Sequence, residues 1–577
     1  MKRLYLLFFI MTCIITQNYS QTKTTEFSPN NLNVGLRNDG QLFNPNFGGG
    51  FSRNDVSGSA LRQAGIMIDG IDIGNNLRNS LPNLYDWFQD FKMESGFSAD
   101  YVHFYPITEF YEVTKEEILA HRADFKDNGI IDQPIESIYG WPAAGNPFFA
   151  SMNGFTIPDS EFEESLAPFY KMSNLSGYHP ELGDFPFVYA NFKYPEEEAI
   201  PDKIIYFTTT TTYGTSPIFN ISYLLYGYQC DENPWTDNTL FLEINMSIVS
   251  ESDIFCPSVS LFLDSYFGFN GDDQICSIPE WNTLLLFDQE KDSNSANQKS
   301  LNSSDYVFVS RMFPLSRNGD KPNNPSYCES YPQNPDTLIN AKMDYTTYRL
   351  LNSNTPVRNF MNGNDVIYHN IANGLWLDGS PMTSAGTGYN PWSTDTVNYI
   401  FEGDIYTKEG WVCEEAEFDP YIPKIVSQTT DLAPFRPNSN IRIMYIFSLF
   451  EHSDSNSIYS QLENFNNHLN DFFFSPFDEL PGDVCSPFSE ESSVQDGSIE
   501  NENFAIQPNP VIDILKVTSN INGKLRIFNP YGQLVSEISC RAGESLSMDF
   551  SAFPKGMYFL NFLTKNHKTT TKKVLKI

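Results

Sequence analysis

Four runs of β-branched and aromatic residues follow one another in the middle of this chain and constrain its fold most. They cover residues 203–212, 218–228, 239–250 and 259–266. Side chains of this kind favour extended backbone, because they pack well on a pleated surface. A long apolar run at 441–450 predicts a further, central strand. The sequence therefore predicts a mainly β fold class, with a large β-rich body.

Two helices are expected within this body. Thr114 and Glu117 have the spacing of a capping box, and Asn128-Gly129 is a typical stop signal. A second helix is predicted where apolar residues recur every three or four positions. These residues are Ile458, Leu462, Phe465, Leu469 and Phe472. Shorter strands, each followed by a turn, are expected at 64–70 and 374–379.

The last part of the chain, residues 504–577, alternates short strand-like runs with turn signals. Asn522-Gly523 is a hairpin signal, and runs such as 524–528 alternate polar and apolar residues. Strands spaced by about ten residues predict a small Ig-like β-sandwich. The turn and strand motifs contain Pro508, Asn509, Pro510, Gly532, Lys555, Gly556, Tyr558, Lys572 and Lys573.

These motifs, in this order and spacing, resemble the type A C-terminal sorting domain of cargo proteins of the type IX secretion system. The resemblance implies that an outer-membrane translocon reads the tail and that its sortase removes it. The protein would pass through the periplasm and be secreted or attached to the outer cell surface. Gln507 stands where the family usually has an aromatic residue.

The body is similar to a family of large, uncharacterised exported proteins that carry this sorting domain. The similarity rests on stretches within 127–147, 166–169, 183–186, 374–389 and 399–411. It implies no activity. Where that family often has an acidic, calcium-type loop, this chain has Lys171, Ser173, Leu175 and Ser176. We therefore predict no metal at 171–184, while calcium elsewhere in this acidic chain stays open and cofactors are unknown.

Charge and hydropathy divide the chain further. A basic end and a short apolar run predict a signal peptide over 1–20. Residues 481–503 hold six acidic residues and no basic one, which predicts a linker between the body, 21–480, and the sorting domain, 504–577. Whether the body is one domain or two stays open. No later stretch is apolar enough to be an integral membrane segment.

The net charge of the chain is −36. Residues 504–577 carry ten Lys or Arg and four Asp or Glu, a net of +6, so the remainder carries −42. So acidic a body would be repelled by nucleic acid and by anionic membranes, and neither is expected as a partner. The expected partners are the secretion translocon, its sortase and an unknown extracellular ligand.

Six cysteines lie between the predicted signal peptide and the predicted sorting domain, an even number that permits disulfides in an exported protein. Cys413 and Cys485 flank the strand and helix that end the body, and they are our candidate pair. No two cysteines have Cys-x-x-Cys spacing, which argues against zinc and thioredoxin-type sites.

The sequence contains no Gly-x-Ser-x-Gly elbow and no His-Glu-x-x-His motif, and we assign no catalytic residue. Trp141, Trp376, Trp392 and Trp411 lie in Gly- and Pro-rich stretches. Of these, Trp376 and Trp411 are candidate ligand-contact aromatics, although we favour the alternative that such aromatics fill the β cores. The sequence favours a secreted binding or structural protein. The alternative is a hydrolase of extracellular polymers that uses paired carboxylates.

Overall fold

The computed structural model describes most of the body and most of the tail. The described residues are 22–46, 50–79, 93–95, 97–100, 103–105, 109–153, 167–175, 177–188, 200–213, 216–248, 253–267, 273–288, 301, 306–313, 343–350, 364–416, 424–432, 440–451, 457–474, 484–485, 504–507, 511–520, 522–529, 534–543, 545–551, 553, 555–564 and 569–576. The predicted signal peptide lies outside them, as does most of the predicted linker. The chain divides into two compact units, residues 1–488 and 489–577.

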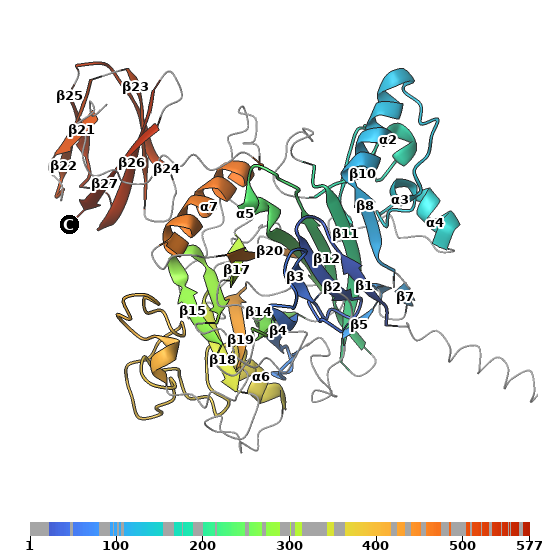
Figure 1. Ribbon diagram of the computed structural model, residues 1–577, viewed down its shortest axis with the longest axis horizontal. Helices are drawn as coiled ribbons and strands as arrows, with labels where there is room; N and C mark the ends of the chain where they lie inside the picture. Colours follow the sequence, from blue (N-terminus) through green and yellow to red (C-terminus); the bar gives the residue numbers. More distant parts are fainter. Residues whose placement is uncertain are drawn as a thin grey trace, which may run out of the picture. The chain divides into compact units, whose positions relative to one another are not determined.

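A nine-stranded antiparallel sheet forms the centre of the body (Figure 1). Its strands, in spatial order, are β15 (Gln274–Ile278), β16 (Thr283–Phe287), β17 (Tyr306–Phe313), β20 (Asn440–Glu451), β13 (Thr239–Ile248), β12 (Ser216–Gly227) and β11 (Lys203–Tyr213), after which β5 (Met93–Ser95) and β8 (Tyr111–Thr114) both pair with β11. The apolar run at 441–450 is the central strand β20, as predicted.

A second sheet of four strands lies against one face of the first. Its order is β18 (Tyr345–Leu350), β19 (Lys424–Asp431), β14 (Ile254–Ser265) and β4 (Leu61–Asp72). Strand β14 begins five residues earlier than predicted, because a bulge between Phe255 and Ser258 carries the strand past Pro257. Smaller sheets contain β1 (Thr24–Phe27), β2 (Leu32–Arg37) and β3 (Phe51–Arg53), β6 (Phe97–Asp100) and β7 (His103–Tyr105), and β9 (Phe169–Tyr170) and β10 (Phe185–Pro186).

Helices cover the other face of the nine-stranded sheet. The long ones are α2 (Lys115–Asn128) and α7 (Ser457–Phe474), both at the predicted places. Thr114 makes the predicted capping box with Glu117, and Gly129 ends α2 with φ +80°. The five apolar residues that predicted α7 are all buried against the sheet. The short helices are α3 (Glu136–Tyr139), α4 (Pro147–Asn153) and α5 (Pro234–Asp237), with 3₁₀ turns η2 (Pro180–Leu182), η4 (Pro279–Trp281) and η6 (Cys413–Ala416). Helix α6 (Asn364–Ala372) packs instead on the second sheet, against Met67 of β4 and Phe262 of β14.

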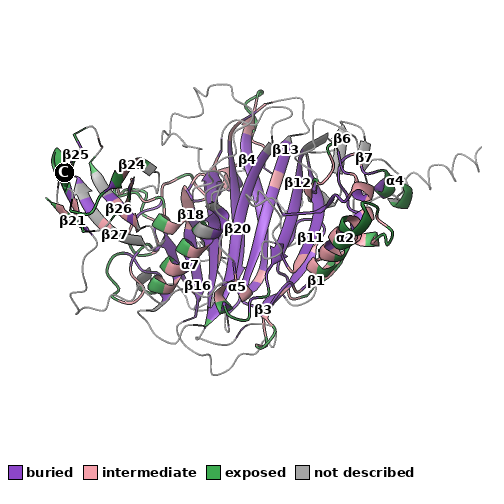
Figure 2. Cartoon of the chain, turned by 90° about the horizontal axis from the view of Figure 1, so that it is seen from above, coloured by how far each residue is buried: buried purple, intermediate pink, exposed green. Residues whose placement is uncertain are grey.

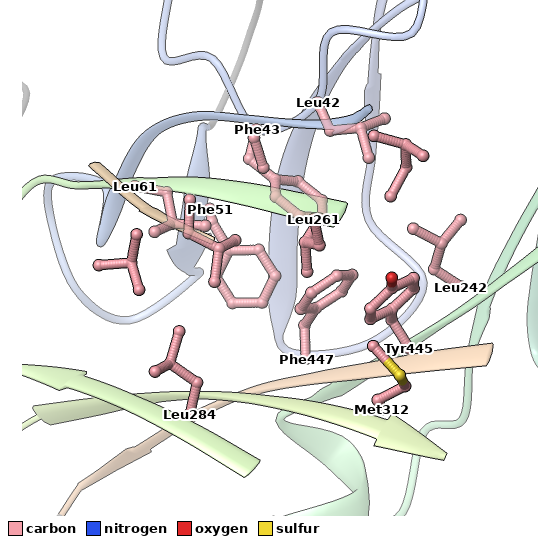
Figure 3. Packing of buried hydrophobic residues seen from close by; sticks show 14 of the residues in the cluster. Leu42, Phe43, Phe51, Leu61, Leu242, Leu261, Leu284, Met312, Tyr445 and Phe447 are labelled. Carbon is pink, nitrogen blue, oxygen red and sulfur yellow. The ribbon is translucent and has the colours of Figure 1, made fainter. Parts of the chain in front are cut away.

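Both faces of the central sheet are therefore covered. On β20, Tyr445 and Phe447 point into the core between the two sheets, and Met444 and Ile446 point into the core under the helices. Figure 2 shows these central strands as buried along their length, whereas α2 carries exposed residues. In the core between the sheets, Phe447 meets Phe43 at 5.1 Å between ring centroids, edge to face (Figure 3). Aromatic pairs of this kind add stability beyond the area that they bury.

The tail is a separate sandwich of two antiparallel sheets. One contains β21 (Phe504–Gln507), β22 (Ile514–Ser519) and β25 (Ser545–Asp549), and the other contains β24 (Leu534–Cys540), β23 (Gly523–Phe528), β26 (Gly556–Thr564) and β27 (Thr569–Lys576). Residues of both sheets share one buried cluster, to which Leu515, Ile527 and Phe562 belong. The predicted mainly β fold class and the Ig-like C-terminal sandwich are confirmed.

Candidate functional site

The irregular segment between α6 and η6 is held in place by hydrogen bonds from two buried indole rings. The Nε1–H of Trp376 donates to the carbonyl of Gly388 at 2.8 Å, and the Nε1–H of Trp411 donates to the carbonyl of Gly386 at 2.9 Å. Only 2% of Trp376 and 7% of Trp411 is exposed. The prediction that these two tryptophans contact a ligand is therefore wrong, because their faces pack in the core and their N–H groups are used internally.

The same segment corrects the predicted strand at 374–379. Leu375 makes one isolated bridge to Pro381, and Gly374 and Gly379 have φ of +73° and +83°, so the backbone turns instead of extending. Gly388 also has a positive φ, +74°, and a Cβ there would lie 2.8 Å from the ring of Trp411. Only glycine fits this approach of backbone to indole.

Trp392 is at the tip of this segment, and 92% of it is exposed. Asn390 holds the tip, because its side-chain oxygen accepts from the N–H of Trp392 at 3.2 Å and its carbonyl accepts from the N–H of Ser393 at 3.0 Å. Sequence reasoning grouped Trp392 with the buried tryptophans. The neighbouring residues in the sequence could have separated the exposed tryptophan from the buried ones. Pro and Ser flank Trp392, whereas apolar residues adjoin Trp376 and Trp411.

A buried carboxylate and an imidazole meet where α6 lies on β4. The Nδ1 of His369 lies 2.7 Å from Oδ2 of Asp69, and Asn79 donates to Oδ1 of Asp69 at 2.5 Å. Burial raises the pKa of Asp69, although the bond to His369 opposes this, and the same bond raises the pKa of His369. Sequence reasoning missed this pair because 300 residues separate its members.

Asp69 and His369 can share a proton between carboxylate and imidazole, as acid–base pairs do. Their described neighbours include no nucleophile. Among the residues that the structure describes, no hydroxyl or thiol is hydrogen-bonded to His369, whose other neighbour is Asn373. Asp69 and His369 form a polar contact between β4 and α6, beside the apolar contacts of Met67 and Phe262 with that helix.

The loop at 171–184 is organised by a carboxylate of its own. Asp184 is buried and accepts from the backbone N–H groups of Met172, Ser173 and His179 at 2.8 to 2.9 Å, and from the hydroxyl of Ser173 at 3.0 Å. Lys171 and Leu175 are exposed, and Ser176 lies outside the described residues. The absence of calcium here stays a prediction. Within the described parts of the chain, no three or more His, Cys, Asp or Glu side chains gather as a metal site.

Cys485 is bonded to Cys230, with the two Cα atoms 4.9 Å apart. The predicted pairing of Cys413 with Cys485 is therefore wrong, and Cys413 is a buried cysteine outside that disulfide. The prediction paired two cysteines that are closer in the sequence. The true partner, Cys230, is 255 residues from Cys485 in the sequence but adjacent to it in space. Cys256 is also disulfide-bonded.

The chain next to Cys485 belongs to the body, although we predicted a linker from 481. Val484 is fully buried in the core under the helices. Its carbonyl accepts from Nε2 of His468 at 2.9 Å and from the hydroxyl of Thr236 at 3.1 Å.

The sorting-motif residues that the structure describes build the tail sandwich. Tyr558 is buried, with its ring 5.6 Å from that of Phe550, and the ammonium of Lys572 lies 5.6 Å from the ring centroid of Phe504. Lys555 is exposed in the turn before β26, Gly556 begins that strand, and Lys573 lies on β27 opposite Phe559. Pro508, Asn509, Pro510 and Gly532 lie outside the described residues.

Comparison with known proteins identifies the C-terminal unit. Residues 505–576 match the family described as the secretion system C-terminal sorting domain. The tail is therefore a sorting domain, which implies handling by the type IX secretion machinery and export to the medium or the cell surface. Among the described residues, no helix has the length and apolar character needed to cross a membrane.

No curated protein matches the chain. Among solved structures, a polysaccharide lyase is similar at 8% identity with a TM-score of 0.19, over 71% of this chain and 38% of the lyase. A likeness at that score carries no argument about fold or activity.

Proposed function

We propose that this protein is a cargo of the type IX secretion system whose body acts outside the cell as a binding protein. The sorting-domain match of residues 505–576 is the observation that carries the export half of this proposal. In this scheme a signal peptide takes the chain to the periplasm, the translocon reads the tail, and the sortase removes it. The body is then released or held on the surface.

The division of the chain supports removal of the tail. The tail has its own buried cluster, and the described clusters of the body contain no residue of the tail. The disulfide between Cys230 and Cys485 ties the last described residues of the body to its sheet, before the boundary at 488. A body closed in this way would keep its fold after cleavage.

A binding role is supported by a difference between two groups of side chains: several carboxylates are hydrogen-bonded within the body, whereas one aromatic ring is exposed to water. Asp69, Asp184 and Asp378 each accept hydrogen bonds from neighbouring residues of the body, as structural carboxylates do. Trp392, in contrast, presents an apolar face to water from a fixed loop. Exposed aromatics on ordered loops are typical of recognition surfaces.

The test of export is deletion of residues 489–577 from the chain, expressed in a host that has this secretion system. We expect the shortened protein to stay in the periplasm while the full chain appears outside. The matched control is Glu537→Gln, which removes the exposed ion pairs of Glu537 in the tail and leaves the core of the tail intact, and it should be exported normally. Equal export of the shortened and full chains would overturn the proposal.

A further inference from the structure

Trp392 is exposed to a degree that packing does not explain. Its indole is 92% accessible, whereas Trp376 and Trp411 of the same segment are buried. A tryptophan in water forgoes the stabilisation that burial of a large apolar side chain provides. We propose that Trp392 is the stacking platform of a binding site for a neutral polysaccharide. This inference rests on the proposed function of the body as a binding protein.

The platform is held in place before any ligand arrives. Gly386 and Gly388, a few residues before the tip, are fixed by the indole N–H groups of the two buried tryptophans. The ring of Tyr389 packs edge to face on Trp376 at 5.5 Å, and its hydroxyl donates to Asp378 at 3.0 Å. A loop ordered in this way loses little conformational entropy on binding, which favours affinity.

Polar residues follow Trp392 in the sequence. Ser393 and Asp395 follow Trp392, and the carboxylate of Asp395 accepts from the hydroxyl of Ser384 at 2.7 Å. A carboxylate can accept several hydrogen bonds, so Asp395 keeps capacity for further donors. Such groups suit the hydroxyls of a sugar ring, while the C–H face of the ring supplies an apolar surface for the indole.

The charge of the segment selects among polymers. Residues 374–407 contain four Asp or Glu and no Lys or Arg, and the chain as a whole carries −36. A polyanion such as a uronate or sulfated glycan would be repelled by these carboxylates. A neutral polysaccharide meets no such repulsion.

The test uses the purified full-length chain and five polymers: cellulose, xylan, mannan, starch and mixed-linkage β-glucan. Affinity electrophoresis or pull-down measures retention, and indole fluorescence reports on the environment of the tryptophans. We expect retention by at least one polymer. Trp392→Ala should weaken it about tenfold or more, the loss typical of a central aromatic contact. Trp392→Tyr, which keeps an aromatic face, should retain most of the binding.

The matched control is Ile73→Ala, because Ile73 is another exposed apolar residue of the body, 77% accessible. It should bind as the parent chain does. Because both changes lie on the surface, near-UV circular dichroism and the unfolding temperature should not change. No retention by any polymer, or equal retention by Trp392→Ala, would overturn the proposal. Loss of self-association in Trp392→Ala, without polysaccharide binding, would also overturn it and assign the tip to a protein contact. These assays need no secretion, so their failure leaves the export proposal untouched.

Discussion

The body and the tail are both β structures, but they bury their strands differently. In the body, every residue of β17 is buried, because the nine-stranded sheet has the second sheet on one face and helices on the other. In the tail, β22 alternates between exposed and buried residues, since each sheet of the sandwich has one face in water. The same strand-forming residues thus build a middle layer in one unit and outer layers in the other.

This difference shows where the aromatic side chains of the body are used. A sheet covered on both faces needs two sets of large side chains, and the body fills both cores with them. High aromatic content is therefore no sign of ligand binding in this chain. An aromatic that the cores leave outside, such as Trp392, is informative for the same reason.

The largest effect should come from a change in the doubly covered sheet. Phe447→Ala removes a fully buried ring that contacts Phe43, Phe51 and Phe308, and we expect it to lower the free energy of unfolding by about 3 to 5 kcal/mol. Ile514→Ala on β22, where the side chain is 54% exposed, should change it by less than about 0.5 kcal/mol. Urea denaturation measures both, and equal losses would contradict the contrast between the units.

The disulfide should give the next largest effect. Cys485→Ser opens a link across 255 residues, and we expect a loss of about 2 to 4 kcal/mol from the body. The matched change is Cys540→Ser in the tail, which removes a buried thiol and should leave the unfolding of the body unchanged. Alkylation with and without reductant, read by intact mass, checks the link. A Cys485 that alkylates without reductant would remove it.

Sequence reasoning succeeded where the signal was local. The capping box at Thr114, the apolar spacing of α7 and the ordered turn motifs of the tail each specify an element within a few residues. The partner of Cys485 and the pairing of Asp69 with His369 depend on contacts between distant parts of the chain. No local pattern encodes them. The roles of the tryptophans could be assigned only once the packing of the cores was known. Gly- and Pro-rich surroundings suggested exposed loops, but three of these indoles are buried, namely Trp141, Trp376 and Trp411.

The polar contact between Asp69 and His369 should make the stability of the body depend on pH. The pKa of His369 is raised above its usual value near 6.5 by the bond to Asp69, so its contribution is complete below that value and is lost as the pH rises through the raised pKa. His369→Gln should therefore cost about 1.5 to 3 kcal/mol at pH 6 and less at pH 9. The tail contributes nothing of this kind among its described residues, and unfolding curves at both pH values provide the check. A cost that does not vary with pH would contradict a charged pair.

The smallest effects compare one surface interaction from each unit. Thr114→Ala removes the cap of α2 and should destabilise the body by about 1 kcal/mol. Glu537→Gln removes the exposed ion pairs with Lys524 and Arg526 and should cost the tail less than about 1 kcal/mol. Added salt should reduce the second cost and leave the first unchanged, because only the ion pairs are screened. Thermal unfolding at two salt concentrations distinguishes them.

The central claim is that the tail is a self-contained export signal and the body its passenger. The most direct measurement fuses a signal peptide and a fluorescent reporter to residues 489–577 and follows the reporter in a host that has the type IX system. The account predicts reporter outside the outer membrane, and none there when the tail or the secretion system is absent. Reporter that stays in the periplasm of the competent host would contradict it.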